Sequence, residues 1–274
     1  MSTVTVTRRA EDGRGIRFYW PGFDAPLEAK DLIALRRNAR RATVLENGSG
    51  GLMRTPEHLL AAALFFADAP IDVRCDAVEP PGLDGSALPF YRMLAACGAA
   101  ARAREYESKL NWEHDGPEGF LRAAPHTHFC VDYSWEDGDV LQYFELSAAA
   151  DAPDQVLGAR TFIAYRDWTA LVGGQNLLAG AGADSGLLIA TNAAEFAEAK
   201  KNLPESRGKS FPLLDPESFR MEDELARHKV LDLLGDLALN GLALPKLRLT
   251  IRNGGHALNH LLLDSLQGEF RRIP

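Results

Sequence analysis

Cysteine is scarce in this sequence, and no two cysteines stand at the spacing of a metal-binding or redox pair. The three that occur, Cys75, Cys97 and Cys130, are widely separated and odd in number. Neither a disulfide framework nor a zinc site made only of thiolates is therefore indicated. Scarce, unpaired cysteines are typical of a protein from a reducing compartment.

Long apolar segments and strongly basic segments are missing too. No apolar run approaches the roughly 20 residues that span a bilayer, and residues 1–4 contain no apolar signal-peptide core. The net charge is −8, so we do not expect the positive surface of a general nucleic-acid-binding protein. We expect a cytoplasmic protein without stable membrane insertion and without a nucleic-acid partner. A solvated face is expected for the dense basic stretch of Arg36, Arg37, Arg40 and Arg41.

The composition that is present suits one large domain or two small ones. Of 274 residues, 46% are hydrophobic and 25% are charged, which is ordinary for a globular protein. Residue patterns and turn signals predict strands at 2–8, 14–19, 41–46, 51–54, 71–78, 108–112, 127–134, 141–146 and 247–252. Apolar spacing and helix-start signals predict helices from Pro56, capped by Thr55, and at 86–102, 222–239 and 255–269. Residues 159–168 are expected to open an irregular, glycine-rich region.

A short pattern occurs twice at one offset. The same 170 positions separate His58 from His228 and Ser86 from His256, and each histidine lies in a predicted helix. An ungapped echo at one offset suggests an internal duplication. We therefore expect an α+β fold of two similar layered domains, residues 1–105 and 106–274, each a sheet with helices on one face. The polar groups of both halves would then meet in a shared cleft.

Several of these polar groups are residues that bind metal ions. His228 and Asp232 are four apart on a predicted helix, so they share one face, and both residue types ligate zinc. His58 would add a third ligand and leave a fourth position for water, with Glu57 beside that water as a general base. Taken singly, each residue has a plainer interpretation. His228 and Asp232 can be a surface pair, His58 an interfacial histidine, and Glu57 can compensate a helix dipole.

Other residues leave alternatives open. His256, which follows two glycines, is interpreted either as an acid or oxyanion-stabilising group or as a loop histidine. Asp236 lies on the same apolar helix as Asp232, and burial of either carboxylate would require a metal or a cation such as Lys229. His260 is expected at the surface or behind the site. No third ligand is spaced to join the two histidines of the Pro125-His126-Thr127-His128 segment, so a structural role is favoured there.

Five motifs occur in an order that resembles the UDP-3-O-acyl-N-acetylglucosamine deacetylases, zinc enzymes that commit sugar nucleotides to lipid A synthesis. The resemblance extends over residues 55–263. The motifs are Thr55-Pro56-Glu57-His58-Leu59-Leu60-Ala61-Ala62, Leu83-Asp84-Gly85-Ser86-Ala87, Ala159-Arg160-Thr161-Phe162, Arg227-His228-Lys229 with Leu231-Asp232, and Gly255-His256-Ala257-Leu258-Asn259.

The resemblance implies a fold, a cofactor and a set of site residues. The fold is a pair of α+β sandwich domains with the active site between them. The cofactor is Zn²⁺, and the substrate is an acylated amino-sugar nucleotide from which the enzyme removes an acetyl group. The implied residues are the zinc ligands His58, His228 and Asp232, the base Glu57, the acid His256, and two substrate-contacting residues, Thr161 and Lys229.

Two departures concern substrate recognition. The Gly-Leu-His-Ser-Gly type motif that opens family members does not occur in these 274 residues, and residues 179–184 differ from the usual Gly-Gly-Ser pattern. We therefore expect a divergent member, with weak or absent activity on the usual substrate and activity on another N-acetylated sugar or nucleotide sugar. A catalytically silent zinc-binding relative is the alternative from outside the enzymes. The sequence does not indicate an oligomeric state.

Overall fold

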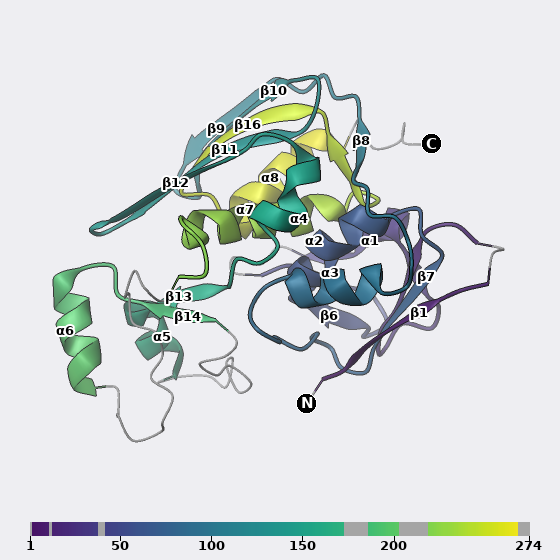
Figure 1. Cartoon of the computed structure of the whole chain (residues 1–274), viewed down its shortest axis with the longest axis horizontal. Coiled ribbons are helices and arrows are strands. Elements are labelled where there is room, and N and C mark those ends of the chain that lie inside the picture. Colours follow the sequence, from purple (N-terminus) through teal and green to yellow (C-terminus); the bar gives the residue numbers. More distant parts are fainter. Residues whose placement is uncertain (1, 11–12, 38–41, 173–185, 203–218, 268–274) are drawn as a thin grey trace.

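Helices and sheets are mixed throughout the chain, as the sequence predicts. The structure is a computed structural model, and it describes residues 2–10, 13–37, 42–172, 186–202 and 219–267. The described residues form an α+β fold in which two larger sheets enclose a layer of helices (Figure 1). Among these residues, no helix combines the length and apolar character needed to cross a membrane.

The N-terminal part carries the smaller of the two main sheets, ordered β1-β7-β2-β3, and a three-stranded sheet, β4-β5-β6. Two longer helices, α2 and α3, accompany them, and the short 3-10 turn 64–66 continues α2. The elements are β1 (Val4–Arg8), β2 (Ile16–Tyr19), β3 (Leu27–Glu28), α1 (Leu32–Leu35), β4 (Arg36–Arg37), β5 (Val44–Glu46), β6 (Leu52–Arg54), α2 (Glu57–Ala63), β7 (Ile71–Cys75) and α3 (Leu88–Ala95).

The C-terminal part carries a five-stranded sheet, ordered β12-β11-β16-β10-β9. A small unit of β13, α5, β14 and α6 extends from it at the lower left of Figure 1. The elements are β8 (Arg104–Tyr106), β9 (Trp112–Gly116), β10 (Gly119–Pro125), β11 (Cys130–Asp137), β12 (Val140–Leu146), α4 (Ala152–Gln155), β13 (Phe162–Ala164), α5 (Tyr165–Val172), β14 (Leu187–Ile189), α6 (Ala193–Asn202), α7 (Glu224–Ala238), β15 (Ala243–Pro245), β16 (Leu247–Arg252) and α8 (His256–Leu266).

The two main sheets repeat one topology. In the first, β7 lies between an antiparallel neighbour, β1, and a parallel neighbour, β2, and β3 pairs antiparallel with β2. In the second, β16 lies between β10, which is antiparallel, and β11, which is parallel, and β12 pairs antiparallel with β11. The central strand follows α2 in one part and α7 in the other. This agreement is what an internal duplication produces.

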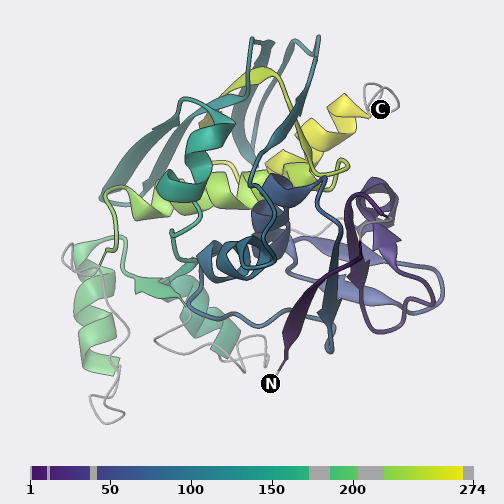
Figure 2. The ribbon, with the colours of Figure 1, turned by 45° about the vertical axis from the view of Figure 1, so that its right-hand side comes forward.

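The helices form the middle of the molecule. Helix α7 packs on the inner face of the large sheet through β11 and β12, α8 packs on β10, and α2 packs against both α7 and α3. Figure 2 shows the large sheet on one side of these helices and β1 and β7 on the other. Nearly all residues of α7 are buried, so this helix is the centre of the hydrophobic core.

The axes of α2 and α7 approach closely because a glycine stands at the contact. A Cβ atom built on Gly235 would lie 2.2 Å from the carbonyl oxygen of Glu57. Glycine inside a helix costs about 1 kcal/mol relative to alanine. Here the missing side chain allows the backbone of α2 to rest directly on α7. This contact determines where the first residues of α2 lie.

Several element boundaries differ from the sequence-based expectation. Thr55 does not cap α2, since its φ is 48° and its hydroxyl donates to Glu79. Helix α3 ends at Ala95 rather than near residue 102, shortly before Gly98, whose φ is 74°. Residues 162–172 are not irregular but form β13 and α5. Residues 179–184, the altered glycine-rich segment, lie outside the described residues.

The basic stretch is not simply a solvated face. Arg36 donates to the carbonyl oxygen of His260 and pairs with Asp264 on α8, which leaves its side chain only 9% exposed. Arg37 is half exposed and pairs with Glu46. Arg40 and Arg41 lie outside the described residues. The described part of this stretch therefore helps to hold α8.

We expect Gly235→Ala to destabilise the protein. Higher helix propensity alone would stabilise α7 by about 1 kcal/mol, but overpacking against Glu57 costs roughly 1–3 kcal/mol. Urea denaturation would measure the change in free energy of unfolding. Gly48→Ala is the matched control, since a Cβ there meets nothing within 4 Å. A Gly235→Ala protein more stable than the parent would contradict the close packing.

Candidate functional site

One face of α7 carries three buried polar residues in a helix whose buried residues are mostly apolar. His228, Asp232 and Asp236 follow one another at intervals of four residues, so their side chains share a face. All three are buried. The first residues of α2, Glu57 and His58, and the first residue of α8, His256, lie against this face. Three helices from distant parts of the chain thus meet at one polar group.

The structure brings the three expected metal ligands together. The Nε2 atom of His228 lies 3.3 Å from Oδ1 of Asp232, and Nε2 of His58 lies 3.7 Å from the same oxygen. The two imidazole rings are nearly perpendicular, with centroids 5.1 Å apart. One ligand atom from each residue lies within 4.8 Å of the others.

His228 is oriented by the backbone of another segment. Its Nδ1 lies 3.2 Å from the carbonyl oxygen of Ala159, which can only accept a hydrogen bond, so Nδ1 carries the proton. Nε2 is then left with a free lone pair facing Asp232. Burial lowers the pKa of His228 to about 3, against the attraction of Asp232, so this imidazole is neutral. A neutral imidazole is the form that binds a metal.

Asp232 is charged although it is buried. Burial favours the neutral carboxyl, but the charges of Lys229 and His256 and a hydrogen bond with His58 outweigh it and hold the pKa of Asp232 well below its usual value. Nζ of Lys229 lies 3.1 Å from Oδ2, whereas His58 and His228 face Oδ1. Lysine therefore compensates one oxygen and leaves the other directed at the histidine pair.

The donor set fits a zinc ion. Zinc in proteins takes imidazole nitrogen at about 2.0–2.1 Å and carboxylate oxygen at about 2.0–2.2 Å, usually in tetrahedral geometry. Tetrahedral donors at those lengths stand roughly 3.3–3.5 Å apart. The separations of 3.3 and 3.7 Å from Asp232 to His228 and His58 are close to that spacing.

Glu57 lies beside this group. It is almost completely buried, its Oε2 accepts a hydrogen bond from the backbone N–H of Thr43, and its Oε1 lies 3.7 Å from Nε2 of His256. Burial raises the pKa of Glu57 above its usual value, although His256 and His58 act in the opposite direction. A carboxylate with a raised pKa is a stronger proton acceptor than one exposed to water.

His256 is held by Asp236. Its Nδ1 lies 2.8 Å from Oδ2 of Asp236, while its Nε2 faces Glu57 and Asp232 at 3.7 and 3.8 Å. Burial disfavours the charged imidazole, but the carboxylates of Asp236 and Asp232 outweigh it and raise the pKa of His256 to about 10. The ring is therefore oriented with a protonated Nε2 toward the polar group.

Asp236 is compensated by a cation, as the sequence led us to expect, but that cation is His256 rather than Lys229. It also accepts hydrogen bonds from the hydroxyl of Thr43 and from the side-chain amide of Asn259, the latter at 2.8 Å. His260, expected at the surface or behind the site, is buried behind it and lies 3.7 Å from Asp236. No sequence pattern points to Thr43, because it lies just before β5 and reaches α7 only through the tertiary fold.

Along the chain, Thr161 lies between Ala159 and Phe162, which both contact His228. The carbonyl of Ala159 accepts from that histidine, and the ring of Phe162 lies 5.9 Å from its ring. Nζ of Lys229 lies 4.9 Å from the centroid of the same phenylalanine. The segment before β13 is therefore adjacent to the polar group, with Thr161 and Lys229 on its border.

Comparisons with known proteins cover most of the chain, including the residues of this site. The model of the family described as LpxC, UDP-3-O-acyl N-acetylglycosamine deacetylase, matches residues 2–200 and 209–268. The UDP-3-O-acyl-N-acetylglucosamine deacetylase of Campylobacter concisus is 31% identical over 98% of this chain and 92% of its own. The enzyme of the same name from Campylobacter lari is 30% identical over 93% and 81%. The chain belongs to the UDP-3-O-acyl-N-acetylglucosamine deacetylase family.

Proposed function

We propose that this protein hydrolyses the N-acetyl amide of an acylated UDP-N-acetylglucosamine, using a zinc ion held by His58, His228 and Asp232. The observation that carries the proposal is the convergence of these ligands with Glu57 and His256 in one buried group. The printed names of the relatives support the substrate. A nucleotide sugar is a cytoplasmic metabolite, so we expect the protein in the cytoplasm.

The bound zinc would supply Lewis-acid polarisation of the acetyl carbonyl and a lowered pKa of water. The protein's own groups do the proton transfers. Glu57 accepts a proton from the attacking water, whose oxygen bonds to the acetyl carbon. Its burial and its position near His58 suit this role.

His256 acts on the other side of the reaction. With Nδ1 fixed on Asp236, its Nε2–H is available to stabilise the developing oxyanion or to protonate the amine as the C–N bond breaks. Either way the acetyl group leaves as acetate and the proton ends on the sugar amine. Asp236 is a positioning residue, since it acts through His256.

Thr161 and Lys229 would contact the substrate. Both border the polar group on the side of β13, where Phe162 supplies an apolar surface. Thr161 is assigned to the acetyl carbonyl and Lys229 to a polar group of the substrate. We also propose two domains, residues 1–105 and 106–274, with this site between them. Each part contains one copy of the repeated sheet, and the proposed boundary falls within β8.

A substrate panel tests the proposed function. The purified protein would be assayed for acetate release from a UDP-3-O-acyl-N-acetylglucosamine and from other acetylated amino sugars and nucleotide sugars. We expect hydrolysis of at least one N-acetylated sugar. Efficiency highest on the UDP-3-O-acyl substrate would establish the specific assignment. Zinc binding without hydrolysis of any substrate in the panel would contradict the proposal and favour a silent zinc-binding relative.

We expect His228→Ala to remove one equivalent of zinc. The substitution deletes a ligand whose free nitrogen faces Asp232 and leaves a carboxylate with one fewer partner. Metal analysis of the purified protein would measure the loss, with His114→Ala as a control outside this group. An undiminished zinc content in His228→Ala would remove the proposed ligand set.

We expect Glu57→Gln to keep its zinc and to lose activity. The amide is nearly the same size but cannot accept the proton of water, and general bases typically contribute on the order of 10²–10⁴-fold in rate. The measurements are kcat and zinc content of the same preparation. Glu79→Gln, at an exposed glutamate, is the matched control. A Glu57→Gln enzyme with the parental kcat would rule out this base.

His256→Ala should also retain zinc while kcat falls by on the order of 10²–10⁴-fold. The reason is that alanine leaves no N–H at the position of Nε2, which lies 3.7 Å from Glu57 and 3.8 Å from Asp232. Steady-state kinetics would separate kcat from KM, and circular dichroism would check the fold. If only KM rises, His256 contributes to binding rather than to proton transfer.

A further inference from the structure

A second cluster of metal-binding side chains lies in the connection from β10 to β11. His126, His128 and Cys130 offer two ring nitrogens and one sulfur, each within 4.8 Å of the others. The two imidazole centroids are 4.5 Å apart, and Sγ of Cys130 lies 3.7 Å from Nδ1 of His126. The sequence-based interpretation that no third ligand joins these histidines was therefore wrong. The chain bends at residues 127 and 128, between the two strands, and this bend brings the three side chains together.

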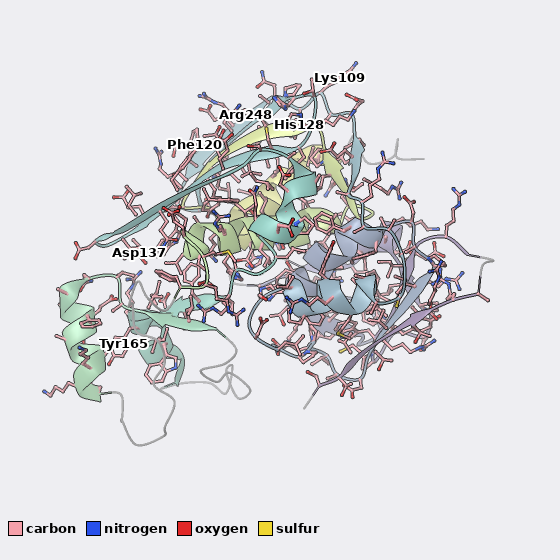
Figure 3. All side chains as sticks on the ribbon, viewed as in Figure 1. Lys109, Phe120, His128, Asp137, Tyr165 and Arg248 are labelled. Atoms are coloured by element: carbon pink, nitrogen blue, oxygen red, sulfur yellow. The ribbon has the colours of Figure 1, made fainter. Side chains whose placement is uncertain are left out.

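This cluster is separate from the catalytic group. Side chains of β11 alternate between the two faces of the large sheet. Tyr133 faces inward and donates to the carbonyl of Gly254, so Cys130 and Asp132 belong to the outer face with their exposed neighbour Arg248. Helices α7 and α8 cover the opposite face (Figure 1). Figure 3 labels His128 and Arg248 on this sheet, at the top of the molecule.

The separation of the donor atoms suits a transition metal. Zinc–sulfur bonds of about 2.3 Å and zinc–nitrogen bonds of about 2.0–2.1 Å place tetrahedral N and S ligands roughly 3.6 Å apart. The 3.7 Å between His126 and Cys130 matches this value. The same Nδ1 lies 3.1 Å from the carbonyl oxygen of His128, so it carries the proton in this structure. Metal binding through Nδ1 therefore moves that proton to Nε2 and replaces this hydrogen bond with the bond to the metal. The hydroxyl of Thr127, 3.1 Å from Nδ1 of His128, orients the second ring.

The surroundings favour a cation. Burial raises the pKa of the Cys130 thiol, and the carboxylates of Asp132, Glu145 and Glu105 act in the same direction, against the one guanidinium of Arg248. Glu105 is anchored next to the cluster, because its Oε1 accepts a hydrogen bond from the backbone N–H of Phe129 at 2.7 Å. Cys130 is 6% exposed, whereas both histidines are only half-buried, so the cluster is open to solvent on the histidine side.

We propose that His126, His128 and Cys130 form a second metal site, which binds Zn²⁺ through two imidazoles and a thiolate and leaves a position open to water. Binding transfers the thiol proton to solvent and forms a metal–sulfur bond, with no change of oxidation state. The connection passes the start of β16, where the N–H of His126 donates to the carbonyl of Lys246. A metal there would tie β10 and β11 together across that strand. The proposal does not depend on the deacetylase function.

Cobalt binding distinguishes the two sites, because only this one contains sulfur. Full-length protein freed of metal with a chelator would be titrated with Co²⁺. We expect a thiolate-to-cobalt charge-transfer band in the near ultraviolet that saturates at one equivalent and is abolished by Zn²⁺. The group of His58, His228 and Asp232 has no thiolate and contributes nothing to this band.

Two variants of the cluster and two matched controls complete the test. Cys130→Ser should lose the band and one equivalent of bound metal while keeping deacetylase activity, and His128→Ala should weaken cobalt binding at least tenfold. Cys75→Ser and Cys97→Ser should keep the band, since both thiols hydrogen-bond only to backbone carbonyls. Absence of the band in the parent, or its persistence in Cys130→Ser, would overturn the proposal. A band given by Cu⁺ but not displaced by Zn²⁺ would overturn the assignment to zinc.

Discussion

The contact between α2 and α7 is the constraint on which the proposed metal site depends, because it joins the two helices that carry the expected ligands. Gly235 lets the backbone of α2 rest on α7, and this places Glu57 and His58 opposite His228 and Asp232. The two helices come from distant stretches of the chain and follow the same strand pattern in two different sheets. A larger residue at position 235 would push the helices apart and draw His58 away from Asp232.

That contact also confines several charges in a hydrophobic core. Buried carboxylates are costly unless they are paired. Here Asp232 is paired with Lys229 and the histidines, and Asp236 with His256, Thr43 and Asn259. Glu57 has only a backbone N–H and more distant imidazoles, so it is the carboxylate whose pKa burial raises. The residue left least compensated is the one best suited to accept a proton.

Much of this arrangement could be predicted from the sequence. The helical period predicted that His228 and Asp232 share one face, and the repeated pattern predicted that His58 lies near them. Residues that act through tertiary contacts could not be found this way: Thr43 reaches Asp236 from a connection almost 200 positions away in the chain. The cluster of His126, His128 and Cys130 was missed because these residues meet through a bend at residues 127 and 128, which spacing along the sequence does not predict. Thr55 was misjudged as a cap because its hydroxyl bonds Glu79 instead.

Because the expected metal ligands lie on two helices, α2 and α7, metal binding would affect stability as well as chemistry. An ion that binds only when α2 is docked on α7 is linked to that docking, because it binds the docked state alone. At a free concentration 100 times its dissociation constant it adds about 2.7 kcal/mol to the docked state. Chelation would withdraw the same amount. The supply of metal would thus govern how long the two parts of the molecule stay together and resist unfolding and proteolysis.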